Sequence, residues 1–431
     1  MSNLDLSEVS RIHFIGIGGI GMSALARYFL HDKKVVSGSD RAPSAITDAL
    51  QNEGVQIFTE QCASNIFANI ELFVYTEAMS HDQEEMAAAA ALGVPMVNYF
   101  EALGLVANPY YLIAVAGTHG KTTTTAMLTD VFEAAGKDPT AVIGSLRAKT
   151  QSNFRAGKSK YAIVEACEYR RDFLFLKPDV LVITNVEYEH TDYYQDLADV
   201  QDAFRTLVTQ VNEGGVVVTD TKHPNIIPII KDSPVPVIDY TEYLDMHLSL
   251  KQPGLHTRMN AAAAKAVALH EKLEEGVVSE ALSEFAGTWR RFEYKGTFQS
   301  APVYDDYAHH PTELRATLSG VRELYPGKNI IAISELHTYS RTASLFNDFA
   351  KITALADQFY FLPIYAAREE NTSGVSIKEL AVKAIEYNPN VSYVPSYELM
   401  IDTLRQVVTD KDVIVFCGAG NITKLATELV K

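Results

Sequence analysis

Short apolar stretches of strand length alternate with helix-like stretches along almost the whole chain. The stretches of strand length are Ile12–Ile15, Leu72–Tyr75, Leu112–Ala116, Tyr161–Val164, Val180–Thr184, Val216–Thr219, Ile330–Ile333, Gln358–Leu362 and Val413–Cys417. This alternation is typical of β-α-β units, in which helices join parallel strands and cover the faces of the sheet. We therefore predict an α/β fold built on largely parallel sheets.

The chain is too long for one ordinary hydrophobic core. Its 431 residues suggest about three domains. Breaks are indicated at Asn108-Pro109, ahead of a second glycine-rich loop, and near Gly287, ahead of Trp289-Arg290-Arg291. We expect domains at residues 1–107, 108–288 and 289–431.

Charge and apolar patterning exclude several classes of partner. The formal net charge of -17 opposes binding to nucleic acid backbones and anionic lipid surfaces. No apolar run approaches the ~20 residues needed to span a bilayer, and the amino terminus lacks the features of an export signal. The three cysteines stand at wide spacing, which suits neither a disulfide framework nor a zinc site. We expect a cytoplasmic monomer or homodimer with no membrane or nucleic acid partner.

A glycine-rich loop follows the first predicted strand. Its glycines are Gly16, Gly18, Gly19 and Gly21, and a helix-like stretch comes next. Such a loop lets the backbone turn tightly and brings a diphosphate onto the amides of the helix. A second strand leads to Ser39 and Asp40, where an acidic side chain commonly holds ribose hydroxyls. The pattern fits a dinucleotide or a nucleotide sugar, and a ligand-free structural turn is the third interpretation.

A second glycine-rich loop follows the strand Leu112–Ala116 and resembles a P-loop, although Val115 replaces one glycine of the usual spacing. Its residues are Gly117, Thr118, His119, Gly120, Lys121, Thr122 and Thr123. In such loops the amides wrap the phosphates of ATP, the lysine, here Lys121, reaches the terminal phosphates, and a hydroxyl, here that of Thr122, binds Mg2+. Two nucleotide sites without an obvious redox group favour a ligase or kinase over a dehydrogenase.

Eight ordered segments from the first strand to the last resemble the Mur ligase family, and within it the branch that joins L-alanine to UDP-N-acetylmuramate. The segments are GIGGIGMS, GTHGKTTT, TNVEYEH, RRFE, DDYAHHPTE, HTYSRT, IYAAREE and GAGNI. The resemblance implies an N-terminal Rossmann-like UDP-binding domain, a central P-loop ATPase-like domain and a C-terminal Rossmann-like domain. It also implies that ATP phosphorylates the muramyl carboxylate and that the amine of alanine attacks the acyl phosphate.

The resemblance also implies roles for residues outside the two loops. It gives Glu165 and His190 as Mg2+ ligands, Asn260 for adenine, Arg291 for ATP phosphates, Asp306 for ribose, and His309 and Arg341 for the amino acid and acyl phosphate. Lys121, His190, His309 and Arg341 are the expected catalytic residues. No lysine lies between Lys177 and Lys222, so the carbamylated lysine of branches that add acidic or larger amino acids has no counterpart here.

The chain departs from the family pattern at several positions. Cys167 stands where EADE has its aspartate, Thr76-Glu77-Ala78 replaces a serine-containing segment, Tyr99 lies near an expected arginine, and Thr257 and Thr338 replace an asparagine and an arginine. Two alternatives stay open. One is the recycling ligase that attaches a whole peptide to UDP-N-acetylmuramate, and the other is a catalytically silent nucleotide-sugar-binding protein.

Overall fold

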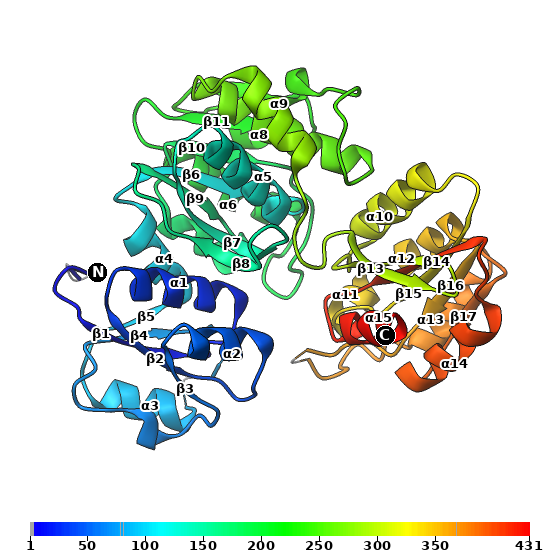
Figure 1. The fold of residues 1–431 in the computed structure, drawn as a ribbon, viewed down its shortest axis with the longest axis horizontal. Coiled ribbons are helices and arrows are strands. Elements are labelled where there is room, and N and C mark those ends of the chain that lie inside the picture. Colours follow the sequence, from blue (N-terminus) through cyan, green and yellow to red (C-terminus); the bar gives the residue numbers. More distant parts are fainter. Residues whose placement is uncertain (1–3, 78, 81, 368) are drawn as a thin grey trace. The chain divides into compact units, whose positions relative to one another are not determined.

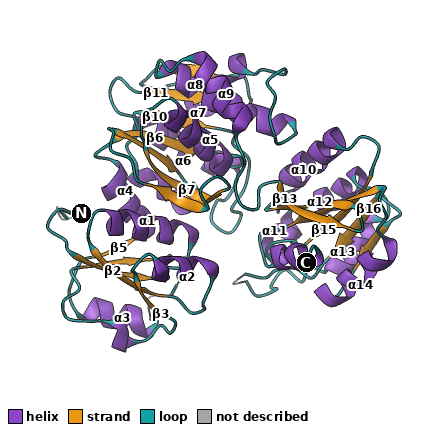
Figure 2. Ribbon diagram, viewed as in Figure 1, coloured by secondary structure: helices purple, strands orange, loops and turns teal. Residues whose placement is uncertain are grey.

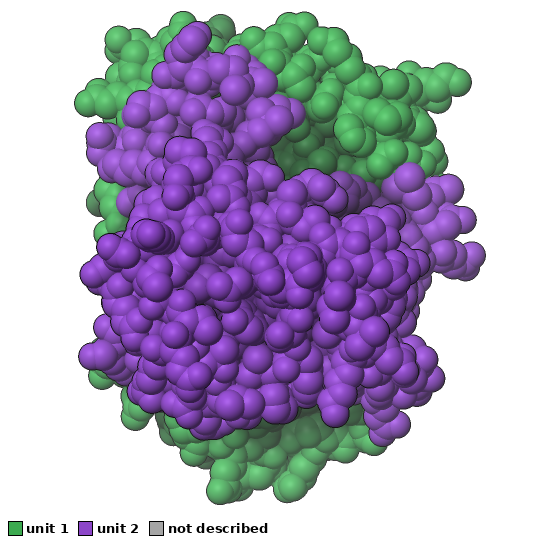
Figure 3. Space-filling model, turned by 90° about the vertical axis from the view of Figure 1, so that its right-hand side faces the viewer, with its two compact units in different colours: residues 1–186, 201–243, 263–282 green, residues 187–200, 244–262, 283–431 purple. Residues whose placement is uncertain are grey.

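The computed structural model describes residues 4–77, 79–80, 82–367 and 369–431. Ala78 and Arg368, which belong to two of the segments quoted above, lie outside the described residues. The chain forms two compact units, one of residues 1–186, 201–243 and 263–282 and the other of residues 187–200, 244–262 and 283–431 (Figure 3). The first unit contains two β-sheets and the second contains one.

The first sheet is an open parallel sheet with the strand order β3-β2-β1-β4-β5. Its strands are β1 (Arg11–Ile15), β2 (Val35–Ser39), β3 (Gln56–Phe58), β4 (Leu72–Tyr75) and β5 (Met96–Asn98). Its helices are α1 (Ile20–His31), α2 (Ala45–Asn52), η1 (Ala63–Asn65), α3 (Glu84–Ala91) and α4 (Tyr99–Ala107). The strand order reverses between β1 and β4, and the crevice beyond their carboxyl ends is where such sheets bind ligands.

The second sheet has the order β12-β11-β10-β6-β9-β7-β8, and only β7 and β8 run antiparallel. Its strands are β6 (Tyr111–Ala116), β7 (Thr140–Arg147), β8 (Ser152–Arg155), β9 (Tyr161–Glu165), β10 (Val180–Ile183), β11 (Val216–Thr219) and β12 (Val237–Asp239). The intervening and following helices are α5 (Lys121–Ala134), η2 (Tyr169–Phe175), α6 (Leu197–Thr209), α7 (Ile227–Ile230), η3 (Tyr240–Tyr243), α8 (Leu255–His270) and α9 (Glu275–Glu284). Strand β10 is buried at every position, as expected for a parallel strand covered on both faces.

The third sheet has the order β13-β14-β18-β15-β16-β17, with β13 antiparallel to β14 and the other pairs parallel. Its strands are β13 (Glu293–Phe298), β14 (Ala301–Asp306), β15 (Asn329–Ser334), β16 (Gln358–Phe361), β17 (Val391–Tyr393) and β18 (Asp412–Cys417). Its helices are α10 (Pro311–Leu324), α11 (Tyr339–Ser344), α12 (Phe346–Ile352), η4 (Thr353–Leu355), α13 (Ile377–Ala384), α14 (Tyr397–Val407) and α15 (Ile422–Leu429).

Two apolar cores cover the opposite faces of this third sheet. Ile330 and Ala332 of β15 pack in one core with α10, α12 and α13, and Ile331 and Ile333 pack in the other with α14 and α15 (Figures 1 and 2). Alternate residues of a strand point to opposite faces, so an uninterrupted apolar strand supplies both cores.

The mixed α/β class and the three parallel-type sheets confirm the fold expected from the sequence. Every stretch predicted as a strand overlaps a strand of the structure, and its ends differ by no more than one residue. Among the described residues, no helix is both long enough and apolar enough to cross a membrane.

Candidate active site

The phosphate loop between β6 and α5 has a backbone that suits glycine at two positions. Gly117 and Gly120 have φ angles of 131° and 84°, a region that side chains with a Cβ rarely adopt. The amide of Thr118 donates to the backbone oxygen of Asn185, and the amide of His119 donates to Oδ1 of the same residue, both at 2.9 Å. These bonds fix the loop, and the first amides of α5 have no carbonyl partner within the helix and can bind a phosphate.

Lys121 lies at the start of α5 and is held by three acceptors. Its Nζ donates to the carbonyls of Gly117 at 2.5 Å and Thr118 at 3.1 Å, and to Oε2 of Glu168 at 2.8 Å. Burial alone would lower the pKa of this ammonium, but the negative charges of Glu168 and its neighbours outweigh burial and raise the pKa. Lys121 is therefore a fixed cation at the mouth of the phosphate loop.

Thr122 and Glu165, both predicted to bind Mg2+, lie side by side. The hydroxyl of Thr122 donates to the two carboxylate oxygens of Glu165 at 3.0 and 2.8 Å. The amide of Gly144 donates to Oε2 of the same carboxylate at 2.9 Å. Glu165 ends β9, which pairs with β6 ahead of the phosphate loop. Hydroxyl and carboxylate oxygens are hard donors of the kind that Mg2+ prefers.

Cys167 lies between Glu165 and Glu168 in the sequence. Burial, followed by the negative charge of Glu168, raises the pKa of its thiol to about 12. The thiolate is the nucleophilic form of cysteine, so this thiol is a poor nucleophile at neutral pH.

The glycine loop of the first sheet is held mainly by backbone contacts. The amides of Gly16 and Ile17 both donate to the carbonyl of Ser39 at 2.9 Å. The amide of Gly18 donates to Oδ2 of Asp40 at 2.9 Å, and that of Gly19 to the carbonyl of Gly16 at 3.3 Å. The Asp40 carboxylate thus supports the shape of the loop.

The side chain of Ser39 points into the protein. Its hydroxyl donates to Oε2 of Glu85 at 2.6 Å, and Oε1 of Glu85 lies 3.1 Å from Nε2 of His13. All three residues are fully buried. At Gly21, a Cβ atom would lie 2.5 Å from the ring of Tyr99, so this glycine lets Tyr99 lie against the start of α1.

In the second unit, Arg341 binds Glu189, the residue just before His190. Nε and Nη2 of Arg341 donate to Oε1 of Glu189 at 2.9 and 2.7 Å, and Nη1 lies 3.1 Å from Nδ1 of His337. Burial would raise the pKa of Glu189, but Arg341 and the nearby histidines lower it to about 2. His190 itself has a φ of 54°, which is uncommon for a residue other than glycine.

His309 lies in the same cluster. Its Nδ1 lies 2.8 Å from the carbonyl of Tyr307, which can only accept a hydrogen bond, so Nδ1 carries the ring proton and Nε2 keeps a lone pair. Burial lowers the pKa of His309 to about 4, and burial likewise lowers that of His337 to about 3. Their rings are 5.7 Å apart. The sequence interpretation did not single out Glu189 or His337, although both lie within segments that carried the family resemblance.

Arg291 lies two residues before β13, and Asp306 ends the neighbouring strand β14. The Asp306 carboxylate accepts the amides of Phe292 at 2.8 Å and Ala308 at 2.7 Å, and burial raises its pKa to about 6 despite Arg291. The Arg291 guanidinium lies 4.9 Å from the centre of the Tyr307 ring.

The neighbouring Arg290 has a structural role. Its buried guanidinium donates to the carbonyls of Gly418, Ala419 and Gly420. It therefore ties the segment ahead of β13 to the loop that follows β18.

Asn260 and His256 lie one turn apart near the start of α8. Asn260 is buried, and burial lowers the pKa of His256 to about 4. Thr257, one of the departures from the family pattern, donates its hydroxyl to the carbonyl of Pro253 at 2.9 Å. These contacts belong to the second unit, together with those of His190, Arg291, Asp306, His309 and Arg341. The two glycine loops and Glu165 belong to the first unit.

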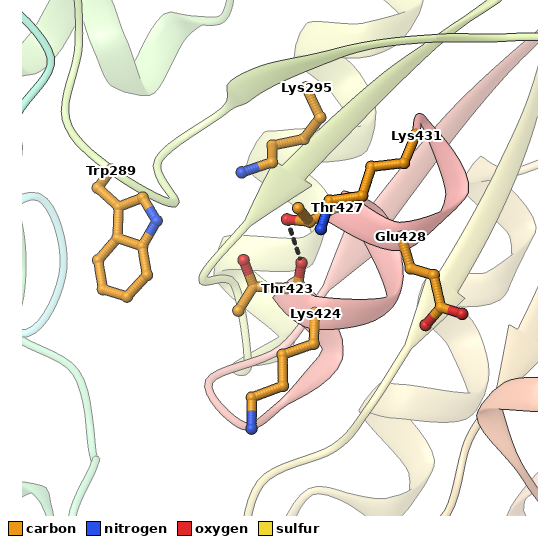
Figure 4. A pocket seen from close by; sticks show the side chains of 7 residues that line it. All are labelled: Trp289, Lys295, Thr423, Lys424, Thr427, Glu428 and Lys431. Carbon is orange, nitrogen blue, oxygen red and sulfur yellow. Dashed lines mark hydrogen bonds between the residues drawn. The ribbon is translucent and has the colours of Figure 1, made fainter. Parts of the chain in front are cut away.

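A pocket of about 400 Å³ lies elsewhere in the second unit, between Trp289 and α15 (Figure 4). Its lining consists of Trp289, Lys295, Thr423, Lys424, Thr427, Glu428 and Lys431. None of these residues is among those predicted for nucleotide or substrate binding.

Three family models match the chain in order. They are the Mur ligase family catalytic domain at residues 11–111, the Mur ligase middle domain at residues 115–244, and the Mur ligase glutamate ligase domain at residues 290–420. Each covers one of the three sheets for most or all of its strands.

Similar proteins match over nearly the whole length. A UDP-N-acetylmuramate–L-alanine ligase of Agathobacter rectalis is 37% identical, with 100% of each chain covered. One of Caldanaerobacter subterraneus subsp. tengcongensis is 36% identical, with 99% of each covered. The crystal structure of the UDP-N-acetylmuramate–alanine ligase of Thermotoga maritima is 27% identical with a TM-score of 0.82, over 97% of this chain and 98% of that one. The chain belongs to the Mur ligase family.

Proposed function

We propose that the chain joins L-alanine to the carboxylate of UDP-N-acetylmuramate, with ATP and Mg2+, and releases ADP and phosphate. The observation that carries the proposal is the phosphate loop whose Thr122 faces Glu165, in a chain that aligns end to end with UDP-N-acetylmuramate–L-alanine ligases. We further propose that it works in the cytoplasm as a monomer or homodimer, with domain boundaries near residues 107 and 288.

The reaction requires a carboxylate to become an electrophile. A carboxylate resists nucleophilic attack because the attack adds negative charge to an anion. Transfer of the γ-phosphate of ATP to a carboxylate oxygen gives an acyl phosphate with a good leaving group. The amine of alanine then attacks the acyl carbon, the C–N bond forms, and the C–O bond to phosphate breaks. In the transition states of both steps, negative charge accumulates on oxygen atoms. Fixed positive groups therefore stabilise these transition states.

Lys121 and the first amides of α5 supply that positive charge at the phosphate loop. The Lys121 ammonium is already ionised and oriented by Glu168, so little reorganisation is needed when a phosphate replaces part of its present shell. Thr122 and Glu165 would hold Mg2+, which supplies further neutralisation of phosphate oxygens when bound.

His309 and Arg341 suit the amino acid. The amine of alanine must lose protons as it attacks, and Nε2 of the neutral His309 ring has a lone pair that can accept one. Arg341 offers a planar pair of donors, which matches a carboxylate. Glu189 occupies those donors here, so an incoming carboxylate would share or replace that contact.

The first sheet suits the nucleotide sugar. Its crevice between β1 and β4 carries the glycine loop, with α1 immediately behind it. The amides of the first turn of α1 and its helix dipole favour a diphosphate at this point.

The deciding experiment incubates the purified chain with ATP, Mg2+ and UDP-N-acetylmuramate and offers L-alanine, glycine, L-serine or a muropeptide tripeptide as acceptor. Phosphate release coupled to a UDP-N-acetylmuramoyl-alanine product supports the proposal. Ligation of the tripeptide alone would instead support the alternative of a ligase that attaches a whole peptide to UDP-N-acetylmuramate. Binding of UDP-N-acetylmuramate without phosphate release would identify a silent binding protein.

A further inference from the structure

An acidic side chain lies at the crevice of the first sheet, where a diphosphate would have to bind. Thr76 follows β4 and lies against the glycine loop, because its Cγ2 is 2.5 Å from where a Cβ on Gly16 would be. Glu77 comes next. Asp40 also places a carboxylate at this loop, 2.9 Å from the amide of Gly18. Two anions beside a ligand that carries two further negative charges would weaken its binding unless a cation balances them.

The structure places such a cation beside Glu77. Nη1 of Arg170 lies 3.3 Å from Oε2 of Glu77, and Nδ2 of Asn98 donates to Oε1 at 3.0 Å. Arg170 comes from η2, which follows β9 of the second sheet, so two sheets of the same unit contribute to the contact. The Arg170 side chain is 49% exposed. It therefore has room to turn toward a ligand.

The backbone that carries Arg170 is unusual. Arg170 and Arg171 have φ angles of 53° and 63°, two consecutive left-handed residues that are not glycine. Residues other than glycine rarely adopt this conformation, and those that do gather at ligand-binding and switch segments. Glu168, the partner of Lys121, directly precedes η2, so this turn is tied to the phosphate loop through Glu168 and to Glu77 through Arg170.

We propose that Arg170 binds the diphosphate of the nucleotide sugar and that Glu77, which pairs with Arg170 in the structure, competes with the diphosphate for the guanidinium. The inference rests on the proposed nucleotide-sugar substrate. It explains why a glutamate is tolerated at a diphosphate crevice: its charge is matched by an arginine of the neighbouring sheet. The guanidinium can face two acceptors at once, and a diphosphate is a stronger acceptor than one carboxylate.

The chain contains a matched control for this role. Arg171 is the next residue, has the same left-handed backbone, and pairs with Asp202 of α6 at 3.0 Å. Replacing either arginine by glutamine removes one charge from the same strained turn. Only Arg170→Gln removes the charge beside Glu77.

The experiment measures the affinity of the full chain for uridine diphosphate by calorimetry, with ATP as a second probe. We expect Arg170→Gln to weaken uridine diphosphate binding about tenfold or more, with ATP affinity unchanged. Arg171→Gln should bind both nucleotides like the wild type. Glu77→Gln should bind uridine diphosphate several-fold more tightly, since it removes a repulsive charge and frees Arg170. In the ligation assay, Arg170→Gln should raise KM for UDP-N-acetylmuramate and not for ATP.

Three results would overturn the inference. The first is wild-type affinity for uridine diphosphate in a folded Arg170→Gln protein. The second is an equal loss in Arg171→Gln, which would point to the turn rather than to the charge. The third, which applies even if Arg170→Gln does not fold, is unchanged or weaker binding by Glu77→Gln. A wild-type chain that binds no uridine diphosphate and ligates no nucleotide sugar would instead refute the proposed function.

Discussion

The pair formed by Lys121 and Glu168 predicts that loss of the lysine affects stability and catalysis by separate routes. The two side chains are 13% and 2% exposed and 2.8 Å apart. Lys121→Met keeps most of the volume of the lysine but leaves a buried carboxylate without its cation. Removing one partner of a buried pair typically costs about 3–5 kcal/mol.

The loss of stability in Lys121→Met has an upper limit at neutral pH. An unpaired Glu168 can take up a proton, and raising a glutamate pKa from about 4.3 to 7 corresponds to about 3.7 kcal/mol. We therefore expect Lys121→Met to lose about 3 kcal/mol and to lower the melting temperature by about 10 °C. The double variant Lys121→Met/Glu168→Gln should recover most of that loss, because its buried amide carries no charge.

The double variant should not recover catalytic activity. Ligation by both variants should fall on the order of a hundredfold or more, because each lacks the oriented cation at the transferred phosphate. Binding of UDP-N-acetylmuramate should largely persist, since its glycine loop lies on the first sheet and Lys121 lies on the second. Differential scanning calorimetry, phosphate release and titration calorimetry give the three measurements. A single variant as stable as the wild type, or a double variant that ligates normally, would refute the reasoning.

Three further outcomes are expected. Glu165→Gln and His190→Ala should each raise the Mg2+ concentration needed for half-maximal turnover, and unchanged Mg2+ titrations in both would return these residues to structural roles. Heavy oxygen in the muramyl carboxylate should appear once per turnover in the released phosphate; label in AMP would instead mean that the substrate is adenylated. The pKa of His309 is lowered by burial to about 4, below the unfolded value of about 6.5. The neutral ring thus contributes up to about 3 kcal/mol above pH 6.5, lost as the pH falls toward 4. Stability measured over that range should fall less steeply in His309→Asn, and equal slopes would contradict the burial argument.

The sequence best predicts those parts of the site whose residues are close together along the chain. The strand, Gly117, Gly120 and Lys121 lie within a few residues of one another, and the loop forms as that spacing indicates. Glu165 directly follows the predicted strand Tyr161–Val164, and parallel pairing of β9 with β6 brings it to Thr122. Adjacent strands of a parallel sheet present their carboxyl ends at one edge, which makes such meetings predictable.

Contacts between distant segments were not predictable in the same way. The partner of Lys121 is Glu168, 47 residues later, and the partner of Arg341 is Glu189, 152 residues earlier. Ser39 was predicted to contact the nucleotide sugar because it lies at the end of a strand, but its hydroxyl donates to Glu85 of α3 in the core. These side-chain contacts depend on how the helices pack on the sheet, and the local sequence alone does not predict that packing.

The thiol of Cys167 gives the phosphate site an unexpected chemical property. Burial raises the pKa of this thiol to about 12, so the thiolate is scarce at pH 7. Alkylating reagents and peroxide react with the thiolate, so they should modify this position very slowly in the folded protein. Cys167, which has Lys121 and Glu168 among its charged neighbours, should therefore react faster with such reagents only when local unfolding exposes the thiol.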